Sequence, residues 1–129
     1  MDPEASYRFT HAVCRKPGRS VVRGLRASDA GDPDFDGFSR EHAAYVEALA
    51  GAGVAVTLLK PLEAWPDSVF VEDPALCVAG AAIILRPGAP SRFGERDAAR
   101  EALGEHFDTV IDLPGDGFID GGDILVTGR

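Results

Sequence analysis

The chain has 129 residues, of which 45% are hydrophobic and 26% charged, as expected for one soluble globular domain. Its formal net charge of -8 would repel phosphate backbones, which argues against nucleic acid as a partner. The two cysteines, Cys14 and Cys77, give no disulfide framework or zinc spacing. Both lie in apolar stretches and are predicted to be buried free thiols, as in a cytoplasmic protein. No apolar run is long enough to span a membrane.

The first half of the chain predicts a strand, a loop, a helix and a second strand. Residues 8–15 alternate loosely and favour a strand. Residues 19–36 are rich in Gly, Arg, Asp and Ser, and they predict a long loop of the kind that often covers a site. Asp34 is suited to cap a helix that runs to Ala50, because apolar residues recur there at helical spacing. Residues 54–59 predict a strand buried on both faces.

The second half predicts a hairpin about Gly80, a helix, and two further strands separated by a turn. These elements cover residues 75–79, 82–85, 94–107, 109–113 and 118–129. The order resembles a repeated strand-strand-helix-strand unit. The apolar strand pattern continues to the last residues, and a strand that stopped there would leave a poorly covered sheet edge. We therefore expect a fragment, or one part of a larger assembly.

Three carboxylates gather around a short apolar run in residues 66–74. Asp67 precedes the Ser-Val-Phe-Val run, and Glu72 and Asp73 follow it. Burying an ionised carboxylate is costly unless a cation or hydrogen-bond donors satisfy it. A guanidinium suits this arrangement, because it pairs with carboxylates through two parallel hydrogen bonds. The stretch therefore predicts the edge of a guanidinium pocket. The alternative is a strand with solvated acids that stops at Pro74.

Four motifs together resemble the dimethylarginine dimethylaminohydrolase family of the guanidino-modifying superfamily. They lie at residues 15–20, 66–74, 86–92 and 120–125. The second motif and the fourth, Asp-Gly-Gly-Asp-Ile-Leu, are the specific ones, and their separation also matches. The resemblance implies an α/β fold that is part of a five-bladed α/β propeller of strand-strand-helix-strand units. Residues 1–129 would form the N-terminal half of its single domain, and the C-terminal half would be absent.

The activity that this resemblance implies is hydrolysis of Nω-methylated arginine to citrulline and an alkylamine, without a cofactor or metal. In the family, a cysteine thiolate attacks the guanidinium carbon and gives a covalent thiouronium intermediate. A histidine acts as general acid and base, and a carboxylate orients it. An arginine deiminase, an amidinotransferase-type relative and a non-catalytic guanidino-binding half-propeller remain open as alternatives.

The resemblance assigns the substrate's guanidinium to the acidic stretch. Asp67 and Asp73 match the positions that bind this group in the family. Phe70 and Glu72 match pocket-wall positions between them. The expected ligand is therefore a small cationic guanidino compound.

The resemblance also assigns roles outside this stretch. Leu25 falls in the lid loop, Arg92 matches an arginine that binds the substrate carboxylate, and Asp120 matches the acid that supports the catalytic histidine. Neither Cys14 nor Cys77 matches the nucleophile, and none of the 3 histidines matches the general acid and base. We therefore predict that this chain alone is inactive. The missing C-terminal half or a partner chain would complete the site, and a homodimer is left open.

Overall fold

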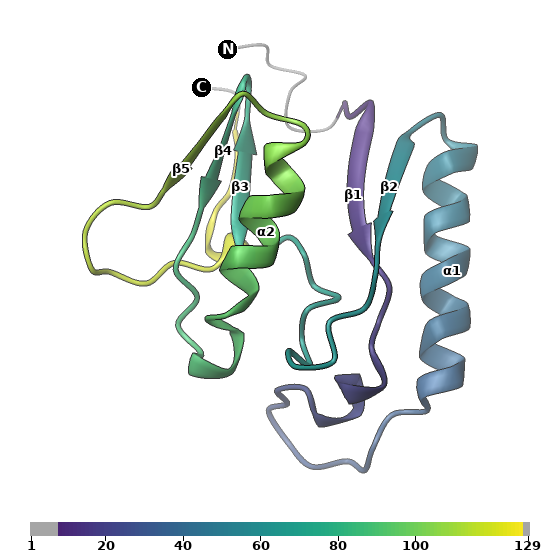
Figure 1. Ribbon diagram of the computed structural model, residues 1–129. Coiled ribbons are helices and arrows are strands. Elements are labelled where there is room, and N and C mark those ends of the chain that lie inside the picture. Colours follow the sequence, from purple (N-terminus) through teal and green to yellow (C-terminus); the bar gives the residue numbers. More distant parts are fainter. Residues whose placement is uncertain (1–7, 128–129) are drawn as a thin grey trace. The chain divides into compact units, whose positions relative to one another are not determined.

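The computed structural model describes residues 8–127, which divide into two compact units (Figure 1). The first unit runs to Val69 and takes in the described residues from Leu125, and the second unit is Phe70–Ile124. The first contains β1 (His11–Arg15), the 3-10 helix η1 (Arg19–Arg23), α1 (Phe35–Gly51) and β2 (Ala55–Leu59). The second contains β3 (Ala75–Val78), β4 (Ala81–Ile84), η2 (Pro90–Arg92), α2 (Glu95–Gly104), β5 (Thr109–Asp112) and η3 (Gly121–Asp123). The predicted mixed α/β class is confirmed.

The first unit is a strand-helix-strand arrangement in which β1 and β2 pair in parallel. Helix α1 connects the strands and packs against β2. As predicted, Asp34 caps α1: its carboxylate accepts hydrogen bonds from the backbone N–H groups of Asp36 at 3.2 Å and Gly37 at 3.0 Å. These contacts satisfy donors that a helix start leaves unpaired. Gly53, just beyond the helix, has a φ of 88°, which favours glycine.

The strand β2 is less buried than the sequence predicts. Ala55 and Leu58 of this strand are exposed, so the expectation that both of its faces are buried is wrong. Among the described residues of α1, none is fully buried, and Tyr45 is exposed. Cys14 on β1 is buried, as predicted. A two-stranded sheet with one helix has too few layers to cover both strand faces.

The second unit confirms one strand-strand-helix-strand unit. The antiparallel hairpin of β3 and β4 turns at Gly80, whose φ is 80°. Helix α2 then leads to β5, which pairs in parallel with β4, and α2 packs against both of these strands. Ala82 and Ile84 of β4 are fully buried, and Leu103 of α2 is also buried. Neither sheet in the described residues closes on itself.

Two predictions for the second unit are wrong. The strand expected over residues 118–129 is not formed in residues 118–127, because Ile119 makes only an isolated bridge with Arg86 and the chain then enters η3; residues 128–129 lie outside the described part of the chain. The Asp123 carboxylate accepts a hydrogen bond from the Asp120 N–H at 3.1 Å, which stabilises this turn against an extended chain. Cys77 is exposed rather than buried, because β3 lies at the edge of its sheet.

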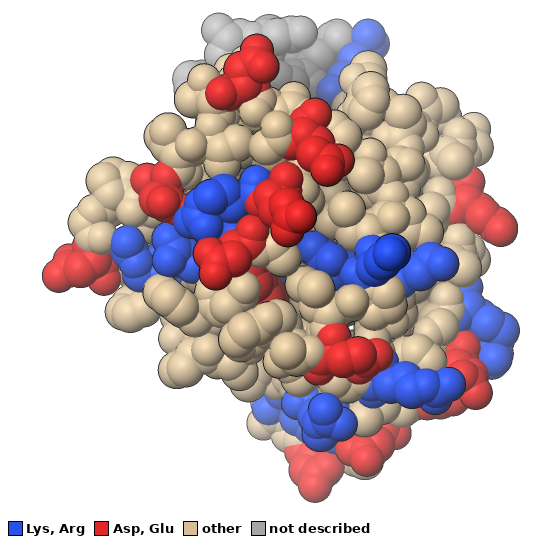
Figure 2. Space-filling view, viewed as in Figure 1, with Lys and Arg blue, Asp and Glu red and all other residues tan. Residues whose placement is uncertain are grey.

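Charged side chains of both signs lie beside one another on the face shown in Figure 2. On the second unit, Arg96 and Arg100 of α2 form ion pairs with Asp112 of β5. The hydrogen bond from Arg100 holds the pKa of the Asp112 carboxyl below its ordinary value. Within residues 8–127, no helix combines the length and apolar character that crossing a bilayer requires.

Candidate functional site

The Asp73 carboxylate and the Arg92 guanidinium form an ion pair inside the second unit. Arg92 is the last residue of η2, three residues before the first residue of α2, Glu95, and is 7% exposed. Its Nη1 donates to Oδ2 of Asp73, whose side chain is 21% exposed. Its Nη2 also donates to the backbone carbonyl oxygen of Phe70 at 3.0 Å. The short helix thus places a buried cation against the segment that carries Asp73.

Glu95 is a second carboxylate bound to Arg92, and it is not among the predicted site residues. Its two oxygens accept from Nε of Arg92, each at 3.1 Å, and one of them accepts from Nη2 at 2.8 Å. Burial acts to lower the pKa of the Arg92 guanidinium, but the bonds to Glu95 and Asp73 outweigh it and raise this pKa. Arg92 therefore stays charged. An acid three residues after an arginine at a helix start is the local signal that could have revealed the pair.

The bend that carries Asp120 is held against the acidic stretch. The Gly121 N–H donates to the Asp73 carbonyl oxygen at 2.9 Å. A Cβ on Gly121 would lie 1.9 Å from the Glu72 carbonyl oxygen, so only glycine permits this approach. The Asp120 carboxylate accepts from the Gly88 N–H at 3.4 Å. The structure thus brings the Asp120 bend and the Asp73 segment together within one unit.

The acidic stretch itself consists of turns and bends. Residues 66–74 include no strand, so the alternative interpretation of this stretch as a strand is wrong. The Phe70 side chain is exposed, while its carbonyl oxygen accepts from Arg92. The Glu72 side chain is also exposed. These turns direct backbone carbonyl oxygens as well as the Asp73 carboxylate toward neighbouring segments.

In the first unit, the Asp67 carboxylate binds the backbone of Leu25. Asp67 is 6% exposed, and both of its carboxylate oxygens accept from the Leu25 N–H at 3.1 Å. A Cβ on Gly24 would lie 2.6 Å from Oδ1 of Asp67, so a larger residue here would displace the Asp67 carboxylate. Leu25 itself is 62% exposed. The structure therefore brings Asp67, the predicted guanidinium ligand, together with Leu25 of the predicted lid loop through a backbone hydrogen bond.

Glu63 fixes the start of the same segment and was also missed from the sequence. Its carboxylate accepts from the backbone N–H groups of Arg19 at 2.8 Å and Ser20 at 2.9 Å. The bond from Ser20, followed by that from Arg19, lowers the pKa of the Glu63 carboxyl. The region predicted as one long loop thus begins with an anchored 3-10 helix, η1. Its partners are 43 and 44 residues away, so no local pattern indicates this contact.

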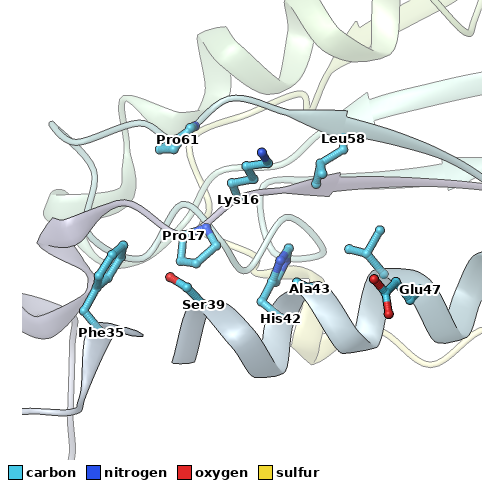
Figure 3. A pocket seen from close by; sticks show the side chains of 10 residues that line it. Lys16, Pro17, Phe35, Ser39, His42, Ala43, Glu47, Leu58 and Pro61 are labelled. Atoms are coloured by element: carbon cyan, nitrogen blue, oxygen red, sulfur yellow. The ribbon is translucent and has the colours of Figure 1, made fainter. Parts of the chain in front are cut away.

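A groove of about 480 Å³ lies between α1 and the strands of the first unit (Figure 3). Lys16 and Leu58 line one side, and Ser39 and His42 of α1 face them. Burial lowers the pKa of the His42 imidazole. None of the predicted site residues lines this groove.

Two kinds of reactive group, metal centres and activated thiols, are not found in residues 8–127. No cluster of three or more His, Cys, Asp or Glu side chains within residues 8–127 could hold a metal ion. Burial raises the pKa of the Cys14 thiol, which favours the neutral form over the nucleophilic thiolate.

Comparison with known proteins first identifies the class of fold. No family model matches the chain. The N-terminal domain of ArgZ, an arginine dihydrolase from cyanobacteria, superposes with a TM-score of 0.76 over 88% of this chain and 43% of that domain. The sequence identity is 20%, so this likeness shows a shared α/β fold alone. The chain thus shares the α/β fold of that domain.

Relatives of higher sequence identity are named dimethylarginine dimethylaminohydrolases. The chain is 43% identical over 121 residues to the N(G),N(G)-dimethylarginine dimethylaminohydrolase of Pseudomonas aeruginosa, covering 93% of this chain and 48% of that protein. A solved structure of the Pseudomonas enzyme, a mutant complexed with citrulline, superposes with a TM-score of 0.88 over the same shares of the two chains. The chain is therefore a homologue of the dimethylarginine dimethylaminohydrolases, as the sequence predicts. It spans about half the length of the curated relatives that it matches.

Proposed function

We propose that the chain supplies the guanidinium-binding part of a hydrolase that acts on Nω-methylated arginine. The observation that carries this proposal is the cluster of Asp73, Arg92 and Glu95. These three side chains together carry one net negative charge, and Asp73 is the most exposed of them. A second guanidinium, that of the substrate, would complete the charge balance at Asp73. Homology to dimethylarginine dimethylaminohydrolases supports this choice of ligand.

The other predicted residues take complementary roles in this proposal. Asp67 is the second guanidinium ligand, and its bond to the Leu25 N–H links ligand binding to the lid. Phe70 and Glu72 form the pocket wall. Arg92 provides the positive charge for the substrate's α-carboxylate. In this proposal, the chain forms half of a five-bladed α/β propeller.

The reaction requires groups that the rest of the protein or a partner chain would supply. A cysteine thiolate attacks the guanidinium carbon, and dimethylamine leaves with a proton from a histidine that Asp120 orients. Water then hydrolyses the thiouronium to citrulline and returns the cysteine. Cys14 does not serve here, because it is buried and the pKa of its thiol is raised. The chain alone should release no citrulline.

The proposal is tested by supplying the missing half. The chain is co-expressed with the part of the Pseudomonas relative that it does not cover, and citrulline release from dimethylarginine is measured, with arginine as the comparison substrate. We expect the complex to act on dimethylarginine, and Asp73→Asn to abolish this activity because the cation loses its charged partner. Asp116→Asn, on an exposed turn, is the matched control. A complex that forms and turns over equally well with Asp73→Asn would refute the proposal.

A further inference from the structure

Glu95 is a buried acid that lies at the first turn of α2 in the second unit. It is 3% exposed and binds the Arg92 guanidinium with both carboxylate oxygens. Burying two charges is costly, and replacing such a pair by apolar side chains of similar volume is often neutral or stabilising. Stability is therefore a weak explanation for placing this pair in the interior. The contacts on the other side of Arg92 suggest a different role.

The contact with Glu95 fixes the orientation of Arg92. A guanidinium is a planar fork, so bonds to two of its nitrogens set the direction of the third. Glu95 accepts from Nε at 3.1 Å and from Nη2 at 2.8 Å. The remaining nitrogen, Nη1, then donates to the Asp73 carboxylate. Glu95, together with the Phe70 carbonyl oxygen that also accepts from Nη2, thus holds the Nη1 edge of Arg92 toward Asp73.

Glu95 also changes the electrostatic environment of Asp73. Arg92 paired with Asp73 alone would be a neutral couple, and a cationic ligand would meet the repulsion of Arg92. The Glu95 carboxylate adds a negative charge next to the same guanidinium. Charges interact more strongly in a partly buried site than in water, so this third group matters at Asp73.

We propose that Glu95 is a positioning residue of the guanidinium site. It holds Arg92 in one orientation and offsets its charge, so that the Asp73 carboxylate binds a cationic guanidino ligand while still bonded to Arg92. This inference rests on the proposed function of Asp73. It adds a determinant of cation binding that itself has no contact with the ligand.

The test uses the 129-residue chain and methylguanidine, a probe that has the guanidinium but no α-carboxylate. Binding is measured by calorimetry for the wild type and for Glu95→Gln, with folding checked by circular dichroism. We expect Glu95→Gln to weaken the affinity for methylguanidine about tenfold or more, because one nearby negative charge is lost. In nuclear magnetic resonance spectra of the ligand-free chain, the Nε–H signal of Arg92 should exchange with water faster in this variant.

Asp97→Asn is the matched control. It removes the same charge from the same helical turn, but Asp97 is exposed and pairs with Arg100 instead. We expect this variant to bind methylguanidine as the wild type does. An equal loss in both variants would point to the helix terminus and overturn the role of Glu95.

The remaining outcomes separate this inference from the function on which it rests. Wild-type affinity in a folded Glu95→Gln variant would overturn the role of Glu95 and leave Asp73 as a ligand. Absence of binding in the wild type would overturn both. If Glu95→Gln does not fold, Glu95→Asp replaces it, because the shorter side chain keeps the charge but lets Arg92 turn. Unchanged affinity in Glu95→Asp would also contradict the inference.

Discussion

Replacing Gly121 by alanine should disrupt the contact between the Asp120 bend and the acidic stretch. The new Cβ would lie 1.9 Å from the Glu72 carbonyl oxygen and 2.9 Å from its carbonyl carbon. The segments would have to separate by roughly 1.5 Å to reach ordinary contact distances. That movement would also break the bond of the Gly121 N–H to the Asp73 carbonyl oxygen, now 2.9 Å long.

The expected cost is the sum of two effects. Overpacking against backbone atoms costs about 1–3 kcal/mol, and the lost hydrogen bond about 1 kcal/mol. We therefore expect the free energy of unfolding to fall by about 2–4 kcal/mol. Urea unfolding followed by circular dichroism measures this change, and faster amide exchange in the bend would localise it.

Gly122→Ala is the matched control for this prediction. Its Cβ would lie 3.6 Å from Oδ1 of Asp73, an ordinary contact, and neither Gly121 nor Gly122 has a positive φ. We expect Gly122→Ala to be nearly neutral. If the two variants unfolded at the same urea concentration, the close approach inferred for Gly121 would be wrong.

Three further predictions concern the two units separately. Glu63→Gln should speed exchange of the two backbone amides that the carboxylate binds. Because the pKa of Glu63 is lowered in the folded chain, its stabilising effect should be present above the ordinary glutamate pKa of about 4.3 and be lost as the pH falls through the lower folded value. The protection factors of the two amides, which compare their exchange with that of an unstructured peptide at the same pH, should fall over this range, and pH-independent protection factors would argue against the effect. Asp34→Ala should lower the free energy of unfolding in urea by about 1 kcal/mol, because α1 loses its capping carboxylate. Glu41→Ala, on an exposed part of α1, should change it little, and an equal loss in both variants would contradict the role of Asp34 as a cap. In the complemented complex, Asp120→Asn should lower kcat more than it raises KM, and the reverse pattern would remove Asp120 from the catalytic group.

Local signals explain why most of the elements could be predicted from the sequence. Asp34 marks the start of α1 because a capping carboxylate acts within a few residues of its own position. Gly80 marks the hairpin because its backbone conformation favours glycine. The last segment was predicted as a strand because its apolar residues outweighed the Asp120–Asp123 contact, which turns the chain into η3.

The site could be predicted only in part, because its contacts join distant segments. The structure brings Asp73 together with Arg92 and with the bend at Asp120. Glu95 and Glu63 were missed, although both are essential parts of the observed geometry. Their partners are a guanidinium fixed by tertiary packing and backbone amides far along the chain. The position of a carboxylate in the sequence does not reveal whether it will bind such a guanidinium or such backbone amides.

The most direct test of the central claim is to observe the Asp73 carboxylate while a ligand binds. The chain is labelled with ¹³C, and the carboxyl signal of Asp73 is followed during titration with dimethylarginine and, separately, with norvaline, which lacks the guanidinium. A guanidinium bound at Asp73 should shift this signal to saturation with dimethylarginine and leave it unchanged with norvaline. Dimethylarginine binding that leaves the Asp73 signal unmoved would place the ligand elsewhere and contradict the account.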